Sequence, residues 1–300
     1  MKRKIEKVDL VNNLPQGKPS NTWKDASIRF RKNKLALFSL FVLILVILLA
    51  IVVPEISRYA YDYVDFEVSF PSSPEFARGH YFGTDSNGRD LLTRIFIGVR
   101  ISILVGLLSS CVSIVIGIIW GSVAGFLGGK IDILMMRIVD ILYALPLMFF
   151  IIILVVVLGR NISLIFIAIG AVGWLTMARI VRGQTMSIKN REFIEASRSY
   201  ALPTWLILVR HIVPNLLGSV IVYMTLTIPS VILMESFISY LGLGVQEPLT
   251  SLGVLIAEGS KVIEDYPWMF IFPCSLLAII LFCFNFIGDG LRDALDQKSK

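Results

Sequence analysis

Long apolar segments alternate with polar ones along this chain, and the apolar segments are long enough to cross a membrane. The first, Leu35–Val53, contains no charged residue. As an α-helix it would rise about 28 Å, close to the thickness of the hydrocarbon core of a bilayer. Five further apolar segments lie at 101–127, 133–158, 163–181, 216–238 and 268–288. The pattern predicts an all-α polytopic membrane protein with six transmembrane helices.

Composition excludes a soluble globular domain. Of the 300 residues, 56% are hydrophobic and only 17% are charged, whereas ordinary globular chains have about 45–50% and about 25%. A soluble protein of this size could not bury so much apolar surface, so lipid must cover part of it. The same figures exclude a disordered chain, a collagen and a coiled coil.

Lys and Arg concentrate in alternate connecting segments. Residues 1–34 carry ten Lys or Arg and three acids, and residues 177–215 carry six and two. Residues 54–99 instead carry four against seven acids, and residues 239–266 carry one against four. Because basic segments tend to stay in the cytoplasm, we expect both termini and the 177–215 segment to lie there.

The polar leader before the first apolar segment has two notable features. It is 34 residues long, and Pro54-Glu55 stands where a signal peptide would carry a small-residue cleavage site, so we expect the first segment to be retained. From Trp23 to Lys32, apolar and basic residues are mixed. This mixture fits an interfacial helix on anionic lipid and simple positive-inside anchoring equally well.

Small residues recur at every fourth position of the second apolar segment: Ser109, Ser113, Gly117, Gly121 and Gly125. This spacing places them on one helix face, where small side chains let another helix approach closely within a membrane. The stripe predicts a packing face, either within this chain or against another subunit.

Three polar residues, Asp140, Glu235 and Asn285, lie inside apolar segments. Each is costly in hydrocarbon, so each should face a partner or a water-filled path, and all three are candidates for lining a translocation pathway. For Asp140 the favoured alternative is an ion pair with Arg137 near the membrane surface. Glu235 fits equally well a second role, as a helix cap or a contact with a neighbouring helix.

The sequence contains no recognisable catalytic or metal-binding motif. Gly128-Gly129-Lys130 lacks both the first glycine and the Ser or Thr of a phosphate-binding loop. His80 and His211, the two histidines, are too far apart to suggest a metal site. Three cysteines lie within apolar segments and are predicted to be packing thiols: Cys111, Cys274 and Cys283. If transport consumes ATP, another chain must bind it.

The polar stretch between the fourth and fifth apolar segments predicts a helical hairpin. We expect one short helix over about 192–200, and after a turn a second one from Thr204, its N-cap, to near Pro214. Glu195 and Arg198 should face the cytosol. Three apolar residues of the second helix should be covered: Trp205, Leu206 and Leu208. Such a hairpin would suit a docking element, but the same pattern is equally typical of an ordinary structured loop.

This hairpin resembles the coupling loop of ABC importer permeases, and specifically of the C-type subunit in the dipeptide/oligopeptide/nickel permease family. That loop carries Glu-Ala-Ala, three residues, Gly, nine residues, then a hydrophobic or His position and Leu-Pro. Here the spacing is kept by Glu195-Ala196-Ser197, Ala201 and His211-Ile212-Val213-Pro214. Ser197, Ala201 and Val213 depart from the pattern. The family glycine would suit a tight turn, so we expect Pro203 to fix that turn here.

Further stretches extend the resemblance over nearly the whole chain. They are residues 29–36, 82–90, 98–102, 137–140, 239–246 and 288–296. Their order and spacing together carry the assignment, since any one of them alone would be weak.

The resemblance implies a non-enzymatic membrane subunit of a prokaryotic importer in the cell (inner) membrane. It implies a second homologous permease, two cytoplasmic ATPase subunits that hold ATP and Mg, and an extracytoplasmic substrate-binding protein. No cofactor or metal on this chain and no nucleic-acid partner are implied. Substrates of the family include dipeptides, oligopeptides and nickel, and the sequence alone does not select among them.

The apolar pattern and the family resemblance together predict the organisation of the chain. A cytoplasmic segment (1–34) precedes the first helix (35–53) and an extracytoplasmic loop (54–99). A core permease domain (100–288) contains the coupling loop 183–215, and a cytoplasmic tail (289–300) ends the chain. Two other classes remain open: an ion-coupled secondary transporter, which would require inverted repeats and paired ionisable groups at the midplane, and a membrane scaffold without transport.

Overall fold

The computed structural model describes residues 22–68, 71–159 and 161–295. Within these ranges the regular structure is helical, and β-bridges occur only as isolated pairs in the loop between α3 and α4. The helices are α2 (Thr22–Lys32), α3 (Lys34–Ile56), α4 (Leu91–Leu127), α5 (Gly129–Tyr143), α6 (Leu147–Leu158), α7 (Ile162–Ile188), α8 (Glu192–Ser199), α9 (Thr204–Ile207), the π-helical turn η1 (Leu208–Ile212), α10 (Val213–Tyr240), α11 (Leu252–Ser260) and α12 (Trp268–Leu295).

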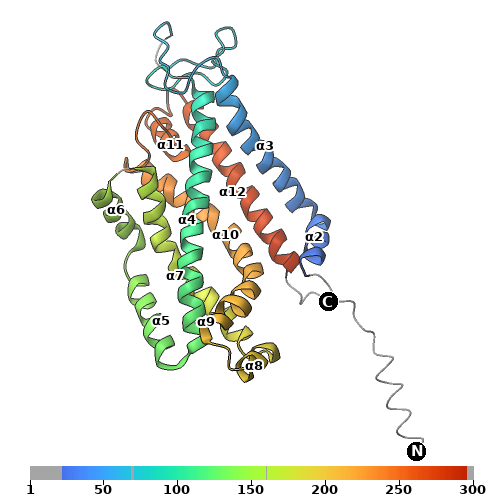
Figure 1. Ribbon diagram of the computed structural model, residues 1–300. Helices are drawn as coiled ribbons and strands as arrows, with labels where there is room; N and C mark the ends of the chain where they lie inside the picture. Colours follow the sequence, from blue (N-terminus) through green and yellow to red (C-terminus); the bar gives the residue numbers. More distant parts are fainter. Residues whose placement is uncertain (1–21, 69–70, 160, 296–300) are drawn as a thin grey trace, which may run out of the picture.

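The long helices form an elongated bundle (Figure 1). Helix α4 runs through its centre and contacts α3, α7 and α10, while α12 packs against α3 and α10. The loop between α3 and α4 lies at one end of the bundle, and α5, α8 and α9 lie towards the other (Figure 1). Five helical segments are long and apolar enough to cross a membrane, and the bent pair α5–α6 brings the number to six within the described residues.

The third predicted span is not one continuous helix. Helices α5 and α6 meet at a bend of 81°, with the break at residues 144–146. Pro146 has no N–H to donate, and it disfavours the helical conformation at the residue before it. The prediction of an unbroken helix over 133–158 was therefore wrong at this proline, although both halves are helical.

Helix α4 begins ten residues earlier than predicted, at Leu91 instead of residue 101. Asp90 caps it, because its side chain accepts a hydrogen bond from the Thr93 N–H at 2.9 Å. With 37 residues, α4 is about 55 Å long and exceeds a hydrocarbon core of about 30 Å. Its first turns therefore belong with the α3–α4 loop.

The small-residue stripe of α4 packs against α7 within the same chain. A Cβ added at Gly117 would come 2.6 Å from the Met177 side chain. At Gly121 it would overlap the Ala178 carbonyl oxygen, and at Gly125 it would lie 2.8 Å from the Arg182 carbonyl oxygen. The two helix backbones therefore approach each other as closely as these glycines allow.

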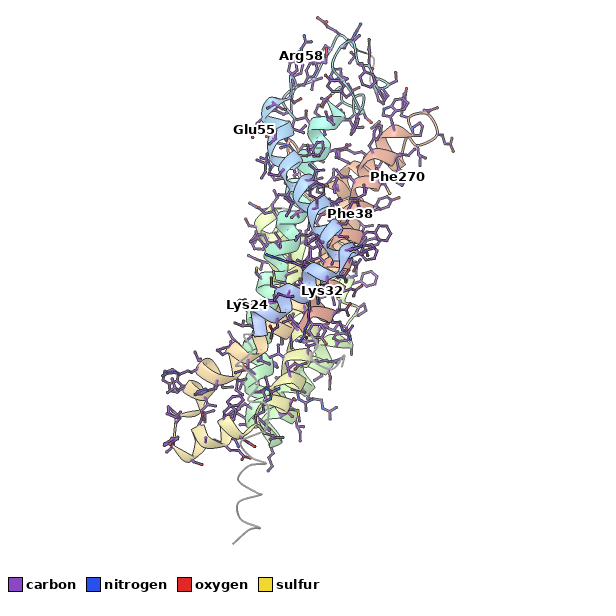
Figure 2. The ribbon with its side chains drawn as sticks, turned by 90° about the vertical axis from the view of Figure 1, so that its right-hand side faces the viewer. Lys24, Lys32, Phe38, Glu55, Arg58 and Phe270 are labelled. Atoms are coloured by element: carbon purple, nitrogen blue, oxygen red, sulfur yellow. The ribbon has the colours of Figure 1, made fainter. Side chains whose placement is uncertain are left out.

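Helices α2 and α3 lie along the right-hand edge of the bundle in Figure 1, which faces the viewer in Figure 2, and both contact α12. Lys24 and Lys32 mark one end of this edge, whereas Glu55 and Arg58 mark the other (Figure 2). Phe38 on α3 is 66% exposed. The mixed segment at 23–32 is thus helical, but the side chain of Trp23 lies outside the described residues.

Candidate functional site: the hairpin between α7 and α10

The predicted hairpin is present, but its second helix does not stop. Helix α8 is followed by a turn, and α9, η1 and α10 then continue from Thr204 to Tyr240. Pro214 stays inside this helix because the π-helical turn widens just before it: the Val213 N–H bonds to the Leu208 carbonyl, five residues back. Two predictions were therefore wrong: the helix does not end near Pro214, and Pro203, not Thr204, stands at the N-cap.

The turn between α8 and α9 depends on Ala201. Its φ is +53°, and it is the one non-glycine residue with a positive φ in the described part of the chain. Its N–H bonds to the Arg198 carbonyl at 2.9 Å, and the Leu202 N–H bonds to the Ser197 carbonyl at 3.3 Å. This left-handed residue just past a helix end is the position at which glycine costs least.

The base of the hairpin is anchored to the bundle. Ile194, Ile207 and Ile212 are buried in one apolar cluster with Phe126 from the end of α4. The Arg198 guanidinium lies 4.9 Å from the centre of the Phe126 ring. Because both arms of the hairpin contribute to this cluster, α8 and α9 are fixed relative to α4 and to each other.

The tip of the hairpin is open. Tyr200 is 82% exposed, Trp205 65% and Val209 62%. The expectation that Trp205 is covered was therefore wrong, whereas Leu206 and Leu208 are half-buried. Glu195 and Ala196 are exposed on α8, the other arm of the hairpin.

The other residues of the loop motif are distributed between the anchored base and the open tip. Ser197 is buried, and its hydroxyl donates to the Phe193 carbonyl at 2.7 Å. Pro203 and Pro214 are exposed, and His211 is half-buried. The serine in place of the family alanine is therefore accommodated by a hydrogen bond within its own helix.

Two ion pairs tie α5 to α7. Asp132 accepts two hydrogen bonds from Arg182, at 2.5 and 2.6 Å, and Asp140 accepts one from Arg179 at 2.8 Å. The partner of Asp140 is therefore Arg179 and not Arg137, so the predicted pairing was wrong. Asp132 is nearly buried, whereas 55% of the Asp140 side chain is exposed.

Glu235 lies in the interior of the bundle and is fully buried. Its carboxylate accepts hydrogen bonds from the hydroxyls of Ser239, one turn along α10, at 2.7 Å and of Ser102 on α4 at 3.1 Å. Ser102 in turn accepts the Leu252 N–H of α11 at 3.2 Å. Glu235 therefore connects three helices instead of opening onto a cavity.

Asn285 is placed differently from the other two polar residues. It is exposed on α12, on the same side as Phe282 and Phe286. The structure therefore brings Asp140, Glu235 and Asn285 to three separate environments and does not assemble them into one site.

A buried charge cluster at the opposite end of the molecule was not identified from the sequence. Arg89 bonds to Asp85 at 2.7 Å and to Glu247 at 3.0 Å, which joins the α3–α4 loop to the loop before α11. Burial alone would lower the pKa of Arg89, but the two carboxylates outweigh it and hold the pKa above its usual value. Arg94 is fully buried, 3.2 Å from Asp85. The i, i+4 spacing of Asp85 and Arg89 is the feature of the sequence that could have indicated this ion pair.

His80 belongs to the same end of the molecule. Its ring nitrogens lie 2.9 Å from Asp90 and 3.3 Å from Asp65, and the ring stacks on Tyr59. The Glu67 N–H and the His80 ring both bond to Asp65 and hold its pKa below the usual value. This pairing gives the histidine a structural role, and no metal-binding cluster occurs among the residues that the structure describes.

Comparison with protein families gives two matches. Residues 113–300 match the family described as binding-protein-dependent transport system inner membrane component. Residues 21–74 match the N-terminal TM domain of oligopeptide transport permease C. Together they cover most of the chain, including the hairpin and both N-terminal helices.

Curated relatives match along almost the whole length. The oligopeptide transport system permease protein OppC of Escherichia coli (strain K12) is 52% identical over 278 residues, which cover 93% of this chain and 92% of that protein. OppC of Bacillus subtilis (strain 168) is 47% identical over 94% of this chain and 91% of its own. The dipeptide transport system permease protein DppC of the same strain is 42% identical over 92% and 85%.

A solved structure shares the fold at low sequence identity. A chain of the methionine ABC transporter MetNI, in an inward-facing conformation, superposes with a TM-score of 0.57. It is 18% identical to this chain and covers 69% of it, and 97% of that chain is matched. The described helices therefore share the fold of the membrane domain of an ABC transporter.

Proposed function

Because this chain belongs to the binding-protein-dependent transport system inner membrane components, and within them to the oligopeptide permease C type, we propose that it forms half of a peptide translocation pathway. It is a multi-pass permease subunit of an ABC transporter in the bacterial inner membrane, without an ATPase domain of its own. ATP binds to the ATPase subunits of that transporter. Relatives named for oligopeptide and dipeptide transport support di- or oligopeptides as the substrate.

The proposed assembly contains three further kinds of subunit. A second, homologous permease completes the pathway, two ATPases dock in the cytoplasm, and an extracytoplasmic binding protein delivers the peptide. The segregation of basic residues supports this orientation, because residues 1–34 and 177–215 are basic and the α3–α4 loop is acidic. The hairpin would then face the ATPases, and the loop with the buried charge cluster would face the binding protein.

The exposed tip and the packed base of the hairpin support a role in coupling the ATPases to the membrane helices. Apolar side chains at its tip are uncovered and the acidic Glu195 is exposed on the same hairpin, while its base is packed on α4. Exposed apolar surface beside a charge is typical of a protein docking site. Closure of the ATPase pair would move the hairpin as one body, and the continuous helix from Thr204 to Tyr240 would carry that movement into the membrane.

The three polar residues that were candidates for the pathway receive different roles in this proposal. Asn285 is exposed, and its side chain makes no hydrogen bond with the described residues, so we assign it to the pathway or to the contact with the second permease. Asp140 and Glu235 are engaged in contacts between helices. We therefore assign them to helix positioning.

Charge reversal at the tip tests the coupling role. In the assembled transporter, Glu195→Lys should abolish ATP-driven peptide uptake, because it replaces the acidic group at the docking surface and leaves the buried anchor intact. Uptake of a labelled tripeptide into cells and immunoblotting of membranes measure function and insertion separately. Glu192→Lys, also exposed on α8, is the matched control. Wild-type uptake by the Glu195 variant would exclude this residue from coupling.

A further inference from the structure

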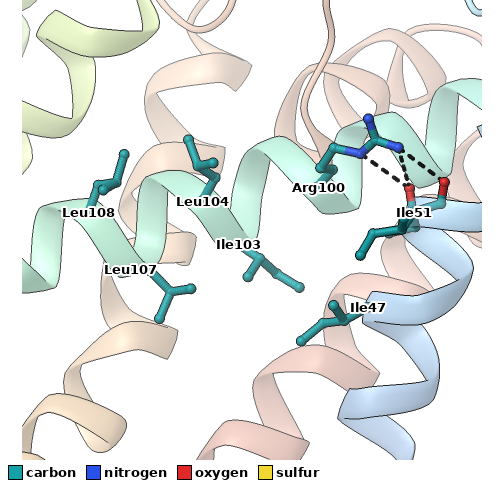
Figure 3. Close-up of a pocket in the computed structure, with 8 residues that line it drawn as sticks. Ile47, Ile51, Arg100, Ile103, Leu104, Leu107 and Leu108 are labelled. Atoms are coloured by element: carbon teal, nitrogen blue, oxygen red, sulfur yellow. Dashed lines mark hydrogen bonds between the residues drawn. The ribbon is translucent and has the colours of Figure 1, made fainter.

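A narrow apolar groove lies on the outside of the bundle, between α3 and α4 (Figure 3). Its volume is about 260 Å³, and its lining includes one charged residue, Arg100. The apolar lining consists of Ile47, Ala50, Ile51, Ile103, Leu104, Leu107 and Leu108. Ile51 and Leu104 are each about half exposed, so the groove opens to the surroundings of the protein and not into its core.

Arg100 is held at the rim by a feature of the α3 backbone. Pro54 has no N–H, so the carbonyl of Ala50, four residues earlier, lacks its helical donor. Arg100 supplies the missing donors: its Nε lies 3.3 Å and its Nη2 3.0 Å from that oxygen, and Nη2 is also 3.3 Å from the Ile51 carbonyl. Figure 3 shows the guanidinium spanning the gap between the two helices. Its direction is thereby fixed.

One side of this guanidinium remains free for a ligand. Nη1 makes no hydrogen bond within the described residues, and 39% of the side chain is exposed. The Glu55 carboxylate lies 3.7 Å from Nη2 and is 73% exposed. The rim therefore presents a positive and a negative group side by side, directly above an apolar channel.

Arg100 and Glu55 lie at the level along α3 where the surface of a bilayer is expected. Ala50 and Ile51 belong to the last turn of the uncharged segment Leu35–Val53, at its end remote from the N-terminus. An apolar segment of that length spans a hydrocarbon core of about 30 Å, so Arg100 lies where lipid phosphates begin.

We propose that this groove binds one phospholipid of the phosphatidylethanolamine class. The phosphate accepts from Nη1 of Arg100, the ammonium pairs with Glu55, and one acyl chain lies along Ile103, Leu104 and Leu107. A zwitterionic head group with N–H donors satisfies both rim charges, whereas an anionic head group satisfies only one. The lipid would fill the gap between the first helix and the rest of the bundle.

Retention of defined lipids by the purified transporter complex tests this site. The complex, delipidated in mild detergent, is incubated with dioleoylphosphatidylethanolamine or dioleoylphosphatidylglycerol, and native mass spectrometry counts the bound lipids. We expect one tightly held phosphatidylethanolamine for each copy of this subunit. Leu104→Trp, which fills the groove, should lower its occupancy about tenfold at limiting lipid. Ile119→Trp, on an exposed position of α4 outside the groove, should retain it.

The rim is tested by a second pair of variants. Arg100→Gln should lower phosphatidylethanolamine retention about tenfold. Because Arg100 also clamps α3, Glu55→Gln provides the independent test: it should remove the preference for phosphatidylethanolamine over phosphatidylglycerol while the complex stays assembled. Equal retention of the two lipids by the wild type would overturn the proposal. So would retention that Leu104→Trp leaves unchanged, or a cysteine at position 104 that cross-links to another subunit.

Discussion

At the scale of single residues, Ala201 occupies a conformation that its side chain disfavours. A left-handed φ costs an alanine about 1 kcal/mol or more relative to glycine, and Ala201 has a φ of +53° at the turn of the hairpin. The neighbouring Pro203 restricts the conformations of the unfolded chain, but it does not remove the cost of the positive φ at Ala201. The hairpin therefore holds its turn against a local preference.

Replacing Ala201 by glycine should stabilise the hairpin. The Ala201→Gly variant relieves the left-handed strain, and we expect a gain of about 0.5–1 kcal/mol in local stability. Hydrogen exchange of the amides in residues 192–204 measures it. Ala196→Gly is the control, because Ala196 lies within α8 and its replacement should cost about 0.5–1 kcal/mol. Effects of the same sign in both variants would contradict the strain at Ala201.

Glu235 should matter as an acceptor more than as a charge. Glu235→Leu leaves the hydroxyls of Ser102 and Ser239 without their acceptor, and we expect it to cost about 1–3 kcal/mol of stability. Glu235→Gln keeps an acceptor oxygen and the shape, so its effect should be smaller. Thermal unfolding of the purified complex compares the two. A glutamine variant as unstable as the leucine variant would show that the carboxylate charge itself is required.

The roles of individual polar residues were only partly predictable. Apolar surroundings identified Asp140 and Glu235 as residues that need partners, but the sequence offered only near neighbours such as Arg137. The actual partner of Asp140, Arg179, lies on another helix. Which helix faces which is a property of the tertiary packing, and hydrophobic periodicity does not record it.

At the scale of helices, apolar length predicted where segments cross but not where they bend or end. Residues 133–158 read as one span because the hydrophobicity hardly changes across the break at residues 144–146, where Pro146 alone marks the bend. Conversely, the sequence predicted a helix end near Pro214, yet the widened turn η1 accommodates this proline and α10 continues. The outcome at each proline depends on which backbone groups the surrounding helix can satisfy.

The small-residue stripe gives a sharp test of helix packing. Gly121→Ala should destabilise the protein by about 1–3 kcal/mol, because the added methyl would overlap the Ala178 carbonyl of α7. Gly183→Ala is the matched control, since nothing lies within 4 Å of a Cβ built at that position of α7. It should be neutral or raise stability by up to about 1 kcal/mol. Denaturation of the purified complex in detergent measures both, and equal losses would contradict the packing role.

At the scale of the whole molecule, one framework connects the hairpin to the buried acid. Helix α4 touches the hairpin base through Phe126 at one end and bonds to Glu235 through Ser102 towards the other. The helix that begins at Thr204 runs from the hairpin to the same carboxylate. The hairpin and the interior of the bundle are thus joined by two continuous helices, so a displacement at the tip would not be absorbed by a flexible link.

The orientation of this framework decides what can move it. If the basic segments face the cytoplasm, a cysteine introduced at the exposed Asn190 beside α8 should react with a membrane-impermeant maleimide only after cells are permeabilised. A cysteine at the exposed Ser73 in the α3–α4 loop should react in intact cells. Both variants are made in a background that lacks Cys111, Cys274 and Cys283. Because the native thiols are removed, mass-tag gel shifts report each site alone. The reverse pattern would place the hairpin on the side without ATP, and the coupling role would then fail whatever the hairpin's shape.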